Sequence, residues 1–401
     1  MPWIVTTTLT VFAPLVLIYW YLGKKLLNAV ALATTWKRQR IRRAVFGVIT
    51  YVNLFPLVFL IVFLLGGRTR VPAFSGESLL IDILLVYPFW FSLVIAIQLF
   101  CLLILTDVAK VLAFPIFRRR KEAWLKGQSK IVVFAVLGVS IYSMFAIIKD
   151  TWTVRITEKE FRLPAQAAPL EGVTLVHIAD VQGDGRTTVA KLERYVQKIN
   201  DLKPDAVLFA GDLVTSGEDY IRSSAEILGR IDARYGMIAA VGDHDIFSNK
   251  AKIFEEMRMN GFLIADDTSM TIDIRDVPVT VTLLTHTYRQ RPQGGDLERA
   301  TNGANGKLKI LLVHQPAESL VEFARERNYD IFLAGHTHGG GIAFGIPGLF
   351  LFAPASLESP YVSGFYQTGS MLVSVTNGLG MTLTPIRFHA PAEISVIRLV
   401  S

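Results

Sequence analysis

Four long apolar runs constrain what this chain can fold into more than any other feature. They occupy residues 3–22, 44–66, 79–105 and 131–148. A helix needs about 20 mainly apolar residues to cross the hydrocarbon core of a bilayer, and about 17 is the lower limit. Charged residues make up only 19% of the chain, below the roughly 25% typical of soluble proteins. The runs therefore predict a membrane domain over residues 1–148 with four transmembrane helices.

The charge is divided unequally between the two parts of the chain. The whole sequence carries +7, but residues 1–148 carry +12 and the remainder carries −5. Seven Lys and Arg lie in each of the first and third loops, whereas the second loop has only Arg68, Arg70 and Glu77. Basic loops stay in the cytoplasm. Four spans then predict a multi-pass protein of the plasma (inner) membrane with everything after residue 148 on the outer, periplasmic side.

The basic clusters have a simpler explanation than nucleic-acid binding. They flank the predicted spans, and no nucleic-acid recognition motif accompanies them. The lipid bilayer is therefore the expected partner, and nucleic acid is not. The oligomeric state is left open.

From residue 171 onward the pattern changes to alternating strands and helices, which predicts an α/β domain over residues 171–401. Residues 149–170, with Pro164 and Pro169, are expected to form a connector. The predicted strands are 173–179, 206–210, 237–241, 270–274, 277–285, 308–313, 331–334, 371–375 and 394–399, and the predicted helices are 191–202, 220–231, 251–259 and 318–327.

Acidic residues and histidines follow five of these strands directly. In open α/β sheets, ligands bind at the carboxyl ends of the strands. Carboxylate oxygens and imidazole nitrogens suit Mn, Fe or Zn, and the single cysteine, Cys101, excludes a cysteine-based zinc cluster. The sequence therefore predicts a metal site. The five polar segments are Asp180-Val181-Gln182, Gly211-Asp212, Gly242-Asp243-His244-Asp245, His314 and Gly335-His336-Thr337-His338-Gly339-Gly340.

Each of these residues has a plainer explanation when taken alone. An Asp after a strand is usually a helix cap or a turn residue, but five such segments in one order are hard to produce by capping. The remaining histidines are different. We expect His177 and His389 to be structural, and the role of His286 is open.

The five segments resemble those of the calcineurin-like metallophosphoesterases, and the resemblance covers roughly residues 173–399. The stretches 376–380 and 385–388 also look like a membrane-linked bacterial branch of that family with N-terminal transmembrane helices. The resemblance implies a four-layer α/β-β/α sandwich of two mixed sheets. It also implies two divalent metal ions, each Mn, Fe, Zn or Mg, at the strand ends.

The resemblance also assigns roles to individual residues. Asp212 would bridge the two metals. Asp180 and His338, with Gln182 in the position of a family histidine, would hold the first metal. His314, His336 and Asp243 would hold the second. The catalytic residues would be His244, which binds phosphate and protonates the leaving group, and Asp245, which orients His244. Arg289 and Arg291 are candidate substrate-binding residues because arginine binds phosphate well.

Two positions depart from the family pattern. The family has Asp-x-His where this chain has Asp180-Val181-Gln182, and a neutral amide oxygen is a weaker ligand than imidazole. The family has Gly-Asn-His where this chain has Gly242-Asp243-His244, which adds a negative charge. Both changes are expected to alter metal affinity and metal preference.

Three functions remain open at this point. The first is a membrane-anchored phosphoesterase that hydrolyses a phosphate ester, phosphodiester or pyrophosphate, expected to be lipid-linked, by attack of metal-activated water. The second is a non-catalytic or weakly active metal-binding sensor or scaffold. The third is a channel or transporter, for which the predicted spans offer no internal charge pair. The sequence does not identify the substrate.

Overall fold

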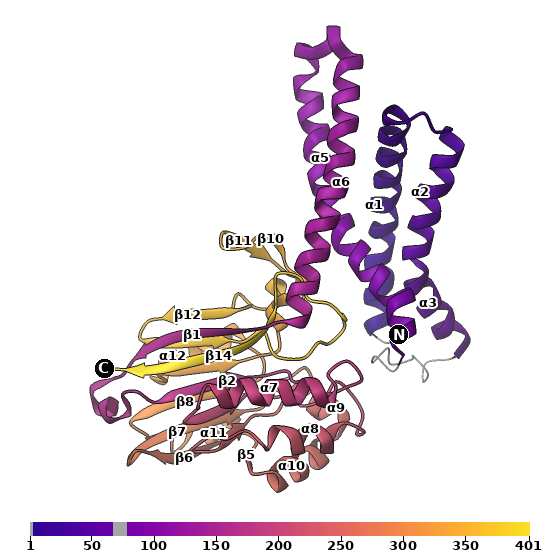
Figure 1. The fold of residues 1–401 in the computed structure, drawn as a ribbon. Coiled ribbons are helices and arrows are strands. Elements are labelled where there is room, and N and C mark those ends of the chain that lie inside the picture. Colours follow the sequence, from indigo (N-terminus) through magenta and orange to yellow (C-terminus); the bar gives the residue numbers. More distant parts are fainter. Residues whose placement is uncertain (1–2, 67–77) are drawn as a thin grey trace. The chain divides into compact units, whose positions relative to one another are not determined.

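The computed structural model describes residues 3–66 and 78–401, which form two compact units, Met1–Ile148 and Lys149–Ser401. Arg68, Arg70 and Glu77 of the predicted second loop lie outside the described residues. Figure 1 shows a helical first unit and a second unit built around two sheets.

Long helices make up the described part of the first unit. Those long and apolar enough to cross a membrane are Pro14–Ala33, Leu79–Ile116 and Lys121–Trp152. The predicted second span, 44–66, falls on two helices that bend by 47° at Asn53, so the described residues contain three candidate spans, or four if the bent pair is one span. The helices are α1 (Trp3–Ala33), α2 (Arg38–Val52), α3 (Leu54–Gly66), α4 (Leu79–Ile81), α5 (Tyr87–Phe117) and α6 (Lys121–Trp152), with single turns at Asp82–Val86 and Arg118–Arg120.

Polar contacts tie some of these helices together. Tyr19 and Ser92 are hydrogen-bonded at 2.6 Å between α1 and α5. Gln98 of α5 donates to Ser143 of α6 at 2.7 Å. Lys25 of α1 forms an ion pair with Asp107 of α5, just beyond the predicted ends of the first and third spans. Such interhelical bonds stabilise helix pairs where water is absent.

The second unit contains two mixed six-stranded sheets and a separate two-stranded hairpin (Figure 1). The first sheet has the order β1-β14-β2-β3-β4-β5, and the second has the order β12-β13-β9-β8-β7-β6. Strands β2 to β5 run parallel to one another, as do β13, β9, β8 and β7. The strands are β1 (Val154–Arg162), β2 (Thr174–Ile178), β3 (Ala206–Phe209), β4 (Met237–Ala239), β5 (Phe262–Ile264), β6 (Thr268–Ile274), β7 (Val277–Leu284), β8 (Leu308–Val313), β9 (Ile331–Ala334), β10 (Phe344–Ile346), β11 (Phe350–Phe352), β12 (Gly364–Thr368), β13 (Met371–Val375) and β14 (Ala392–Val400).

Three buried apolar clusters define four layers. One cluster lies between the sheets and includes Leu175 and Leu208 from the first sheet and Val281 and Leu312 from the second. A second cluster fills the space between the first sheet and α7, α8 and α10, and a third lies between the second sheet and α11 and α12. The helices are α7 (Val189–Asp201), α8 (Ile221–Leu228), α9 (Asp243–Ser248), α10 (Lys250–Met259), α11 (Gly295–Thr301) and α12 (Glu318–Glu326), with helical turns at Ala165–Leu170, His338–Gly340 and Pro354–Leu357.

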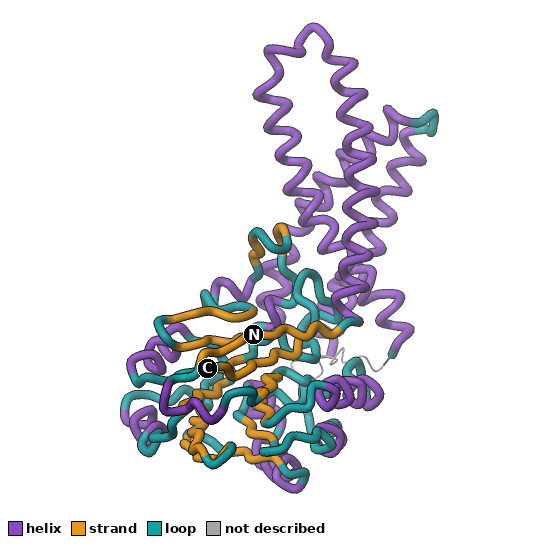
Figure 2. The backbone as a smooth tube through the Cα atoms, turned by 60° about the vertical axis from the view of Figure 1, so that its left-hand side comes forward, coloured by secondary structure: helices purple, strands orange, loops and turns teal. Residues whose placement is uncertain are grey.

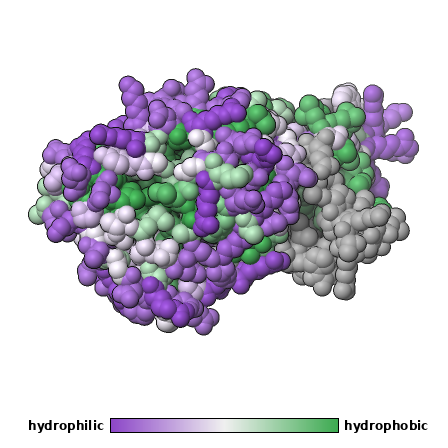
Figure 3. All heavy atoms as spheres, turned by 90° about the horizontal axis from the view of Figure 1, so that it is seen from below, coloured by the Kyte–Doolittle hydropathy of each residue, from purple (hydrophilic) through white to green (hydrophobic). Residues whose placement is uncertain are grey.

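The predicted fold class, apolar helices followed by a four-layer sandwich, is confirmed. Strand β2 could be predicted from a mainly apolar run because both of its faces are buried. Successive residues of β2 face opposite sides, so Leu175 enters the cluster between the sheets while Val176 and Ile178 pack under the helices. In Figure 3 hydrophilic residues cover much of the visible face, with apolar residues between them.

The structure differs from the sequence prediction in the segment 149–170. We expected only a connector, but β1 lies there and pairs in parallel with β14. The strand is an edge strand with mostly exposed, charged side chains, so it lacks the buried apolar run that identifies a central strand. The same difficulty applies to β5, β10, β11, β12 and to α9 and α11, which are short and were not predicted.

Candidate metal centre

The five polar segments predicted at strand ends meet at one place in the second unit. They follow β2, β3 and β4 of the first sheet and β8 and β9 of the second. Two groups bring ligand atoms within 4.8 Å of one another: Asp180 with Asp212 and His314, and Asp243 with His314 and His336. Residues from both sheets therefore share a single buried cluster, with His314 common to both groups.

Several side-chain atoms of this cluster are buried without a hydrogen-bond partner among the described residues. They are Asp180 Oδ1, Gln182 Oε1 and His338 Nδ1. Buried polar atoms are nearly always satisfied, and an unsatisfied one often indicates an ion. All three atoms can ligate a divalent cation, so the donor set fits the expected metals.

The charges of the cluster also favour a cation. Burial raises the pKa of Asp180 to about 6. Burial lowers the pKa of His314, but the carboxylates of Asp212, Asp180 and Asp243 outweigh it and hold that pKa well above its ordinary value. A positive charge at this place is therefore stabilised, and a divalent ion would supply one without a proton.

Contacts around the imidazoles and carboxylates fix which atoms face the cluster. His314 Nδ1 lies 2.8 Å from the Ala210 carbonyl, which leaves Nε2 at 3.3 Å from Asp212 Oδ2 and 3.4 Å from Asp243 Oδ2. Gln182 Nε2 donates to Asp212 Oδ2 at 2.7 Å. A histidine held through one ring nitrogen presents the other to a metal in a fixed direction.

The backbone of the cluster adopts conformations that few residues tolerate. Asp180, Gln182, Asp212, His336 and His338 all have positive φ. Non-glycine residues with positive φ cost free energy and concentrate at functional sites. Glycine is needed beside them: at Gly378, with φ of +68°, a Cβ atom would lie 2.5 Å from Asp180 Cβ.

His244 lies at the edge of the cluster, and both its ring and its backbone amide make hydrogen bonds there. Its Nδ1 is hydrogen-bonded to the Thr215 carbonyl, and its Nε2 lies 3.3 Å from Thr382 Oγ1 and 4.0 Å from Asp212 Oδ2. Its amide donates to Asp212 Oδ1 at 2.8 Å. Because Nδ1 is occupied, Nε2 is the atom that can exchange a proton near the cluster.

Asp245 does not orient His244 as the sequence suggested. Its buried carboxylate accepts hydrogen bonds from the amides of Gly242, Asp212 and Leu213 at 2.8–2.9 Å. It therefore caps α9 and holds the loop that carries Asp212, and a backbone carbonyl orients the imidazole instead. The short side chain of an Asp beside a histidine can accept hydrogen bonds from nearby backbone amides instead of contacting the imidazole.

Comparison with known proteins gives the family. The family model for calcineurin-like phosphoesterases matches residues 173–340. The chain is 30% identical over 286 residues to the uncharacterized metallophosphoesterase YkuE of Bacillus subtilis, an alignment that covers 70% of this chain and 98% of YkuE. This chain is a member of the metallophosphoesterase family.

Two more relatives of this metallophosphoesterase extend the comparison. A transmembrane protein with metallophosphoesterase domain from Danio rerio is 28% identical over 342 residues, covering 77% of this chain and 74% of the relative. The UDP-2,3-diacylglucosamine pyrophosphatase LpxG of Chlamydia muridarum is 24% identical over 333 residues, an alignment that covers 66% of this chain and 98% of LpxG. The predicted resemblance and the prediction of a phosphoester hydrolase are confirmed.

Three further residues of the metallophosphoesterase domain that the sequence analysis named, Arg289, Arg291 and His177, make contacts away from the cluster. Arg289 lies over the Phe247 ring at 4.5 Å, and Arg291 Nε donates to the Thr287 carbonyl at 3.3 Å. Neither contact joins an arginine to the cluster. His177 is buried between the sheets, 3.1 Å from Ser374 Oγ, and burial lowers its pKa to about 3. His177 is therefore a neutral structural residue.

Further residues support the cluster, and of these the sequence analysis named only His286, whose role it left open. Gln315 Nε2 donates to Asp243 Oδ2 at 2.8 Å, and His286 Nδ1 lies 3.1 Å from Gln315 Oε1. The amide of Tyr288 donates to Asp243 Oδ1 at 2.7 Å. Gln315 follows His314 directly in the sequence, whereas Tyr288 acts through its backbone amide, which no sequence pattern marks.

Arg387 is another residue that the sequence analysis did not single out. It is fully buried and donates hydrogen bonds to the carbonyls of five residues, and burial lowers its pKa to about 10. Gly380, one of the five, also donates its amide to the Asp180 carbonyl. Arg387 therefore holds the loop that packs against Asp180. The five carbonyls belong to His338, Asn377, Gly378, Gly380 and Ala390.

Glu358 contacts the outer side of the cluster. Its Oε2 accepts from the Tyr288 hydroxyl at 2.8 Å and lies 3.5 Å from His336 Nε2, while His336 Nδ1 faces Asp243 at 3.1 Å. Metal-ligating histidines usually donate their other N–H to such a carboxylate, and its loss costs about 10–100-fold in metal affinity.

We therefore expect Glu358→Gln to weaken metal binding at least about 10-fold, because it weakens the acceptor for His336 Nε2. Chelator competition on the full-length protein measures this. Glu322→Gln, which breaks only an exposed pair with Arg325 on α12, is the control. Equal affinities in both variants would show that Glu358 does not position His336.

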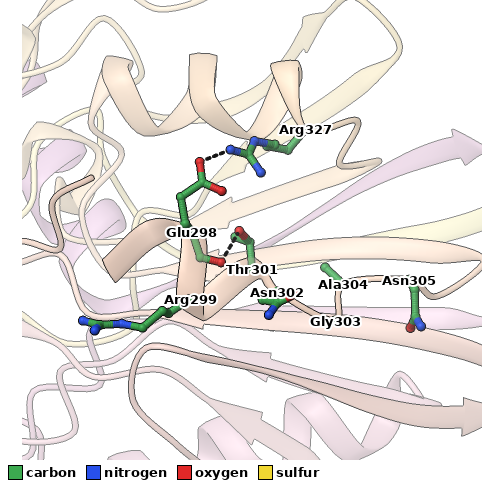
Figure 4. A pocket seen from close by; sticks show the side chains of 8 residues that line it. All are labelled: Glu298, Arg299, Thr301, Asn302, Gly303, Ala304, Asn305 and Arg327. Carbon is green, nitrogen blue, oxygen red and sulfur yellow. Dashed lines mark hydrogen bonds and ion pairs between the residues drawn. The ribbon is translucent and has the colours of Figure 1, made fainter. Parts of the chain in front are cut away.

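A surface hollow elsewhere in the domain is not part of this centre. It has a volume of about 420 Å³ and is lined by the end of α11, the following loop and Arg327 (Figure 4). It lies at the opposite end of β8 from His314, and its one carboxylate, Glu298, is paired with Arg327. The hollow therefore lacks the ligand groups that the strand ends provide.

Proposed function

We propose that this chain is a membrane-anchored metal-dependent phosphoesterase that hydrolyses a phosphate ester, phosphodiester or pyrophosphate of a lipid-linked substrate. The observation that carries the proposal is the buried cluster of three carboxylates and two imidazoles, with His338 Nε2 3.4 Å from Asp180 Oδ1 and with unsatisfied ligand atoms, in a chain with long apolar helices. The proposed metal ligands are Asp180, Gln182, Asp212, Asp243, His314, His336 and His338.

Two divalent ions held there would supply positive charge for the phosphoryl oxygens and lower the pKa of water toward neutrality. The protein's own part in the reaction is to hold and deliver a proton. With Nδ1 fixed by Thr215, His244 can carry a proton on Nε2 and donate it to the leaving oxygen. Asp212 and Thr382, on either side of Nε2, keep the ring facing the cluster.

Two facts support a lipid-linked substrate. The apolar helices suggest membrane association, which would keep the domain near lipid head groups. The relative LpxG is named as a pyrophosphatase of a diacylated nucleotide sugar. Both point to a phosphate or pyrophosphate attached to an acylated molecule.

The test uses the full-length protein in lipid nanodiscs with Mn, Zn, Fe or Mg added. Water-soluble phosphomonoesters and phosphodiesters are compared with phospholipids and lipid-linked pyrophosphates. We expect hydrolysis that requires metal and is fastest with a lipid-linked substrate. Hydrolysis of none of them with any of these metals would refute the proposal.

The second candidate, a metal-binding sensor or scaffold, has one observation in its favour. Gln182 replaces an imidazole and donates to Asp212, an arrangement that weakens the first metal site. The sensor would bind metal and turn over no phosphoester. The nanodisc assay together with metal analysis separates the two functions.

Gln182→His is expected to raise the affinity for the first metal, because imidazole is a better ligand for Mn, Fe or Zn than an amide oxygen. The measurement is bound metal per chain by mass spectrometry after dialysis against a graded chelator series. Gln367→His, at an exposed position on β12, is the control. An unchanged affinity for the first metal would mean that Gln182 does not face that metal.

We also propose that the metallophosphoesterase domain lies on the outer, periplasmic side of the plasma membrane, following the basic first and third loops. A reporter fused after Ser401 that is active only in the periplasm should give signal, and one active only in the cytoplasm should not. The opposite result would indicate three spans or five rather than four.

A further inference from the structure

The most apolar exposed segment of the second unit follows the metal cluster directly. No charged residue occurs from 339 to 357. Its middle part, residues 344–352, forms the hairpin of β10 and β11, with residues 347–349 as the turn between them. Figure 2 shows the hairpin standing apart from the two large sheets. The exposed fractions include 74% for Leu349 and 58% for Phe350. The other exposed apolar side chains of the hairpin are Ile346, Leu351 and Phe352.

Single exposed apolar residues are normal, but a contiguous group indicates an interaction surface. Aromatic and leucine side chains on a turn without charge are poorly suited to water. They are well suited to the boundary between head groups and acyl chains, where interfacial segments bury such residues.

The root of the hairpin lies beside the end of α6. Ile342 bridges to Phe388, the Ala343 amide donates to the Phe388 carbonyl at 2.9 Å, and the Phe344 and Phe388 rings are 6.0 Å apart. On either side of Phe388, two residues of the last turn of α6 contact the same stretch. The Arg387 amide donates to Thr151 at 3.0 Å, and the His389 amide donates to Asp150 at 2.7 Å.

These contacts lie within the unit that begins at Lys149, and they join the hairpin to the end of a candidate membrane span. Only Thr153 separates α6 from β1, so the tether between span and domain is very short. Trp152, in the last turn, is 59% exposed, and tryptophan is enriched at membrane interfaces.

We propose that the tip of the β10–β11 hairpin inserts into the acyl region of the bilayer that holds α6. The short tether gives the hairpin a high effective concentration at the lipid surface, so even modest apolar burial suffices for docking. The segment starts after His338 and ends at Glu358, which contacts His336. A docked hairpin therefore holds the metal cluster close to the lipid phase, where an acylated substrate resides.

The test places an environment-sensitive fluorophore at the tip of the full-length protein in nanodiscs. Leu349→Cys in a Cys101→Ser background carries the label, and Met259→Cys on α10, with 66% of its side chain exposed, is the matched control. We expect the label at 349 to be blue-shifted, quenched by nitroxides on lipid acyl chains and shielded from iodide. The label at 259 should behave as in water.

Two results with the label at 349 would overturn the proposal. Iodide quenching at 349 equal to that at 259 would mean that the tip is in water. Shielding from iodide without nitroxide quenching would mean that protein, such as a second copy of the chain, covers it. Adding Phe350→Ser and Phe352→Ser should abolish nitroxide quenching at 349, with circular dichroism as the folding check. Because no substrate is involved, failure here is distinct from failure of the phosphoesterase proposal.

Discussion

Replacing His244 by alanine is expected to lower kcat for phosphoester hydrolysis by about 10²–10⁴-fold, the usual contribution of a general acid. The reason is geometric: the Thr215 carbonyl holds Nδ1, and Nε2, 3.3 Å from Thr382 Oγ1, is the ring nitrogen beside the cluster. The measurement is steady-state hydrolysis by the full-length protein, with a substrate that has a poor leaving group. A substrate with a good leaving group needs less protonation and should show a smaller loss.

Metal analysis of the same variant is the control. His244 is not among the proposed metal ligands, so the bound metal per chain should equal that of the wild type. Unchanged hydrolysis would exclude His244 as the acid. Parallel loss of metal and activity would make it a ligand instead, and both results would require the roles around Asp212 to be reassigned.

Replacing Arg387 by methionine is expected to destabilise the domain by about 3 kcal/mol or more, since each buried acceptor left without a donor costs about 1–3 kcal/mol. Five carbonyls lose the guanidinium as a donor in this variant, and two of them, His338 and Gly378, keep a backbone amide donor. For a domain of this size the loss corresponds to a decrease in Tm of roughly 6–12 °C. Thermal unfolding of the full-length protein in nanodiscs measures it.

Metal affinity should fall in the same Arg387 variant, because the loop against Asp180 loses its support. Arg398→Met is the control: Arg398 makes an ion pair with Glu158 at the sheet surface, and exposed pairs contribute at most about 1 kcal/mol. If both variants had the same Tm and the same metal affinity, Arg387 would have no part in positioning the site.

The fold and the location of the site could be predicted because both depend on local patterns. Buried strands such as 206–210 end in a glycine and an acid, and parallel strands bring their carboxyl ends to one edge. This pattern predicts that Asp180 and Asp212 lie at one sheet edge, and the resemblance to the metallophosphoesterases joined His314 to them; their ligand atoms lie within 4.8 Å of one another. The exact role of each residue stays a proposal.

The residues that escaped prediction depend on contacts between distant parts of the chain. Glu358 meets His336 only because the segment after the hairpin folds back over the cluster. Arg387 looks like a surface residue in the sequence, yet it is buried and donates to carbonyls of the turn at His338 and of its own loop between β13 and β14. Asp245 was assigned to His244 because the two are neighbours, whereas the backbone turn directs its carboxylate toward the amides of the Asp212 loop.

The pairing of β1 with β14 has a consequence for how the protein is made. Strand β1 leaves the end of α6, but its neighbour in the sheet spans Ala392–Val400. During synthesis α6 can enter the membrane long before that neighbour exists, so β1 must wait as an unpaired polar strand at the membrane. Closure of such distant contacts is slow. The acidic and basic side chains of β1 would then protect the nascent domain from pairing with other chains while the ribosome finishes β14.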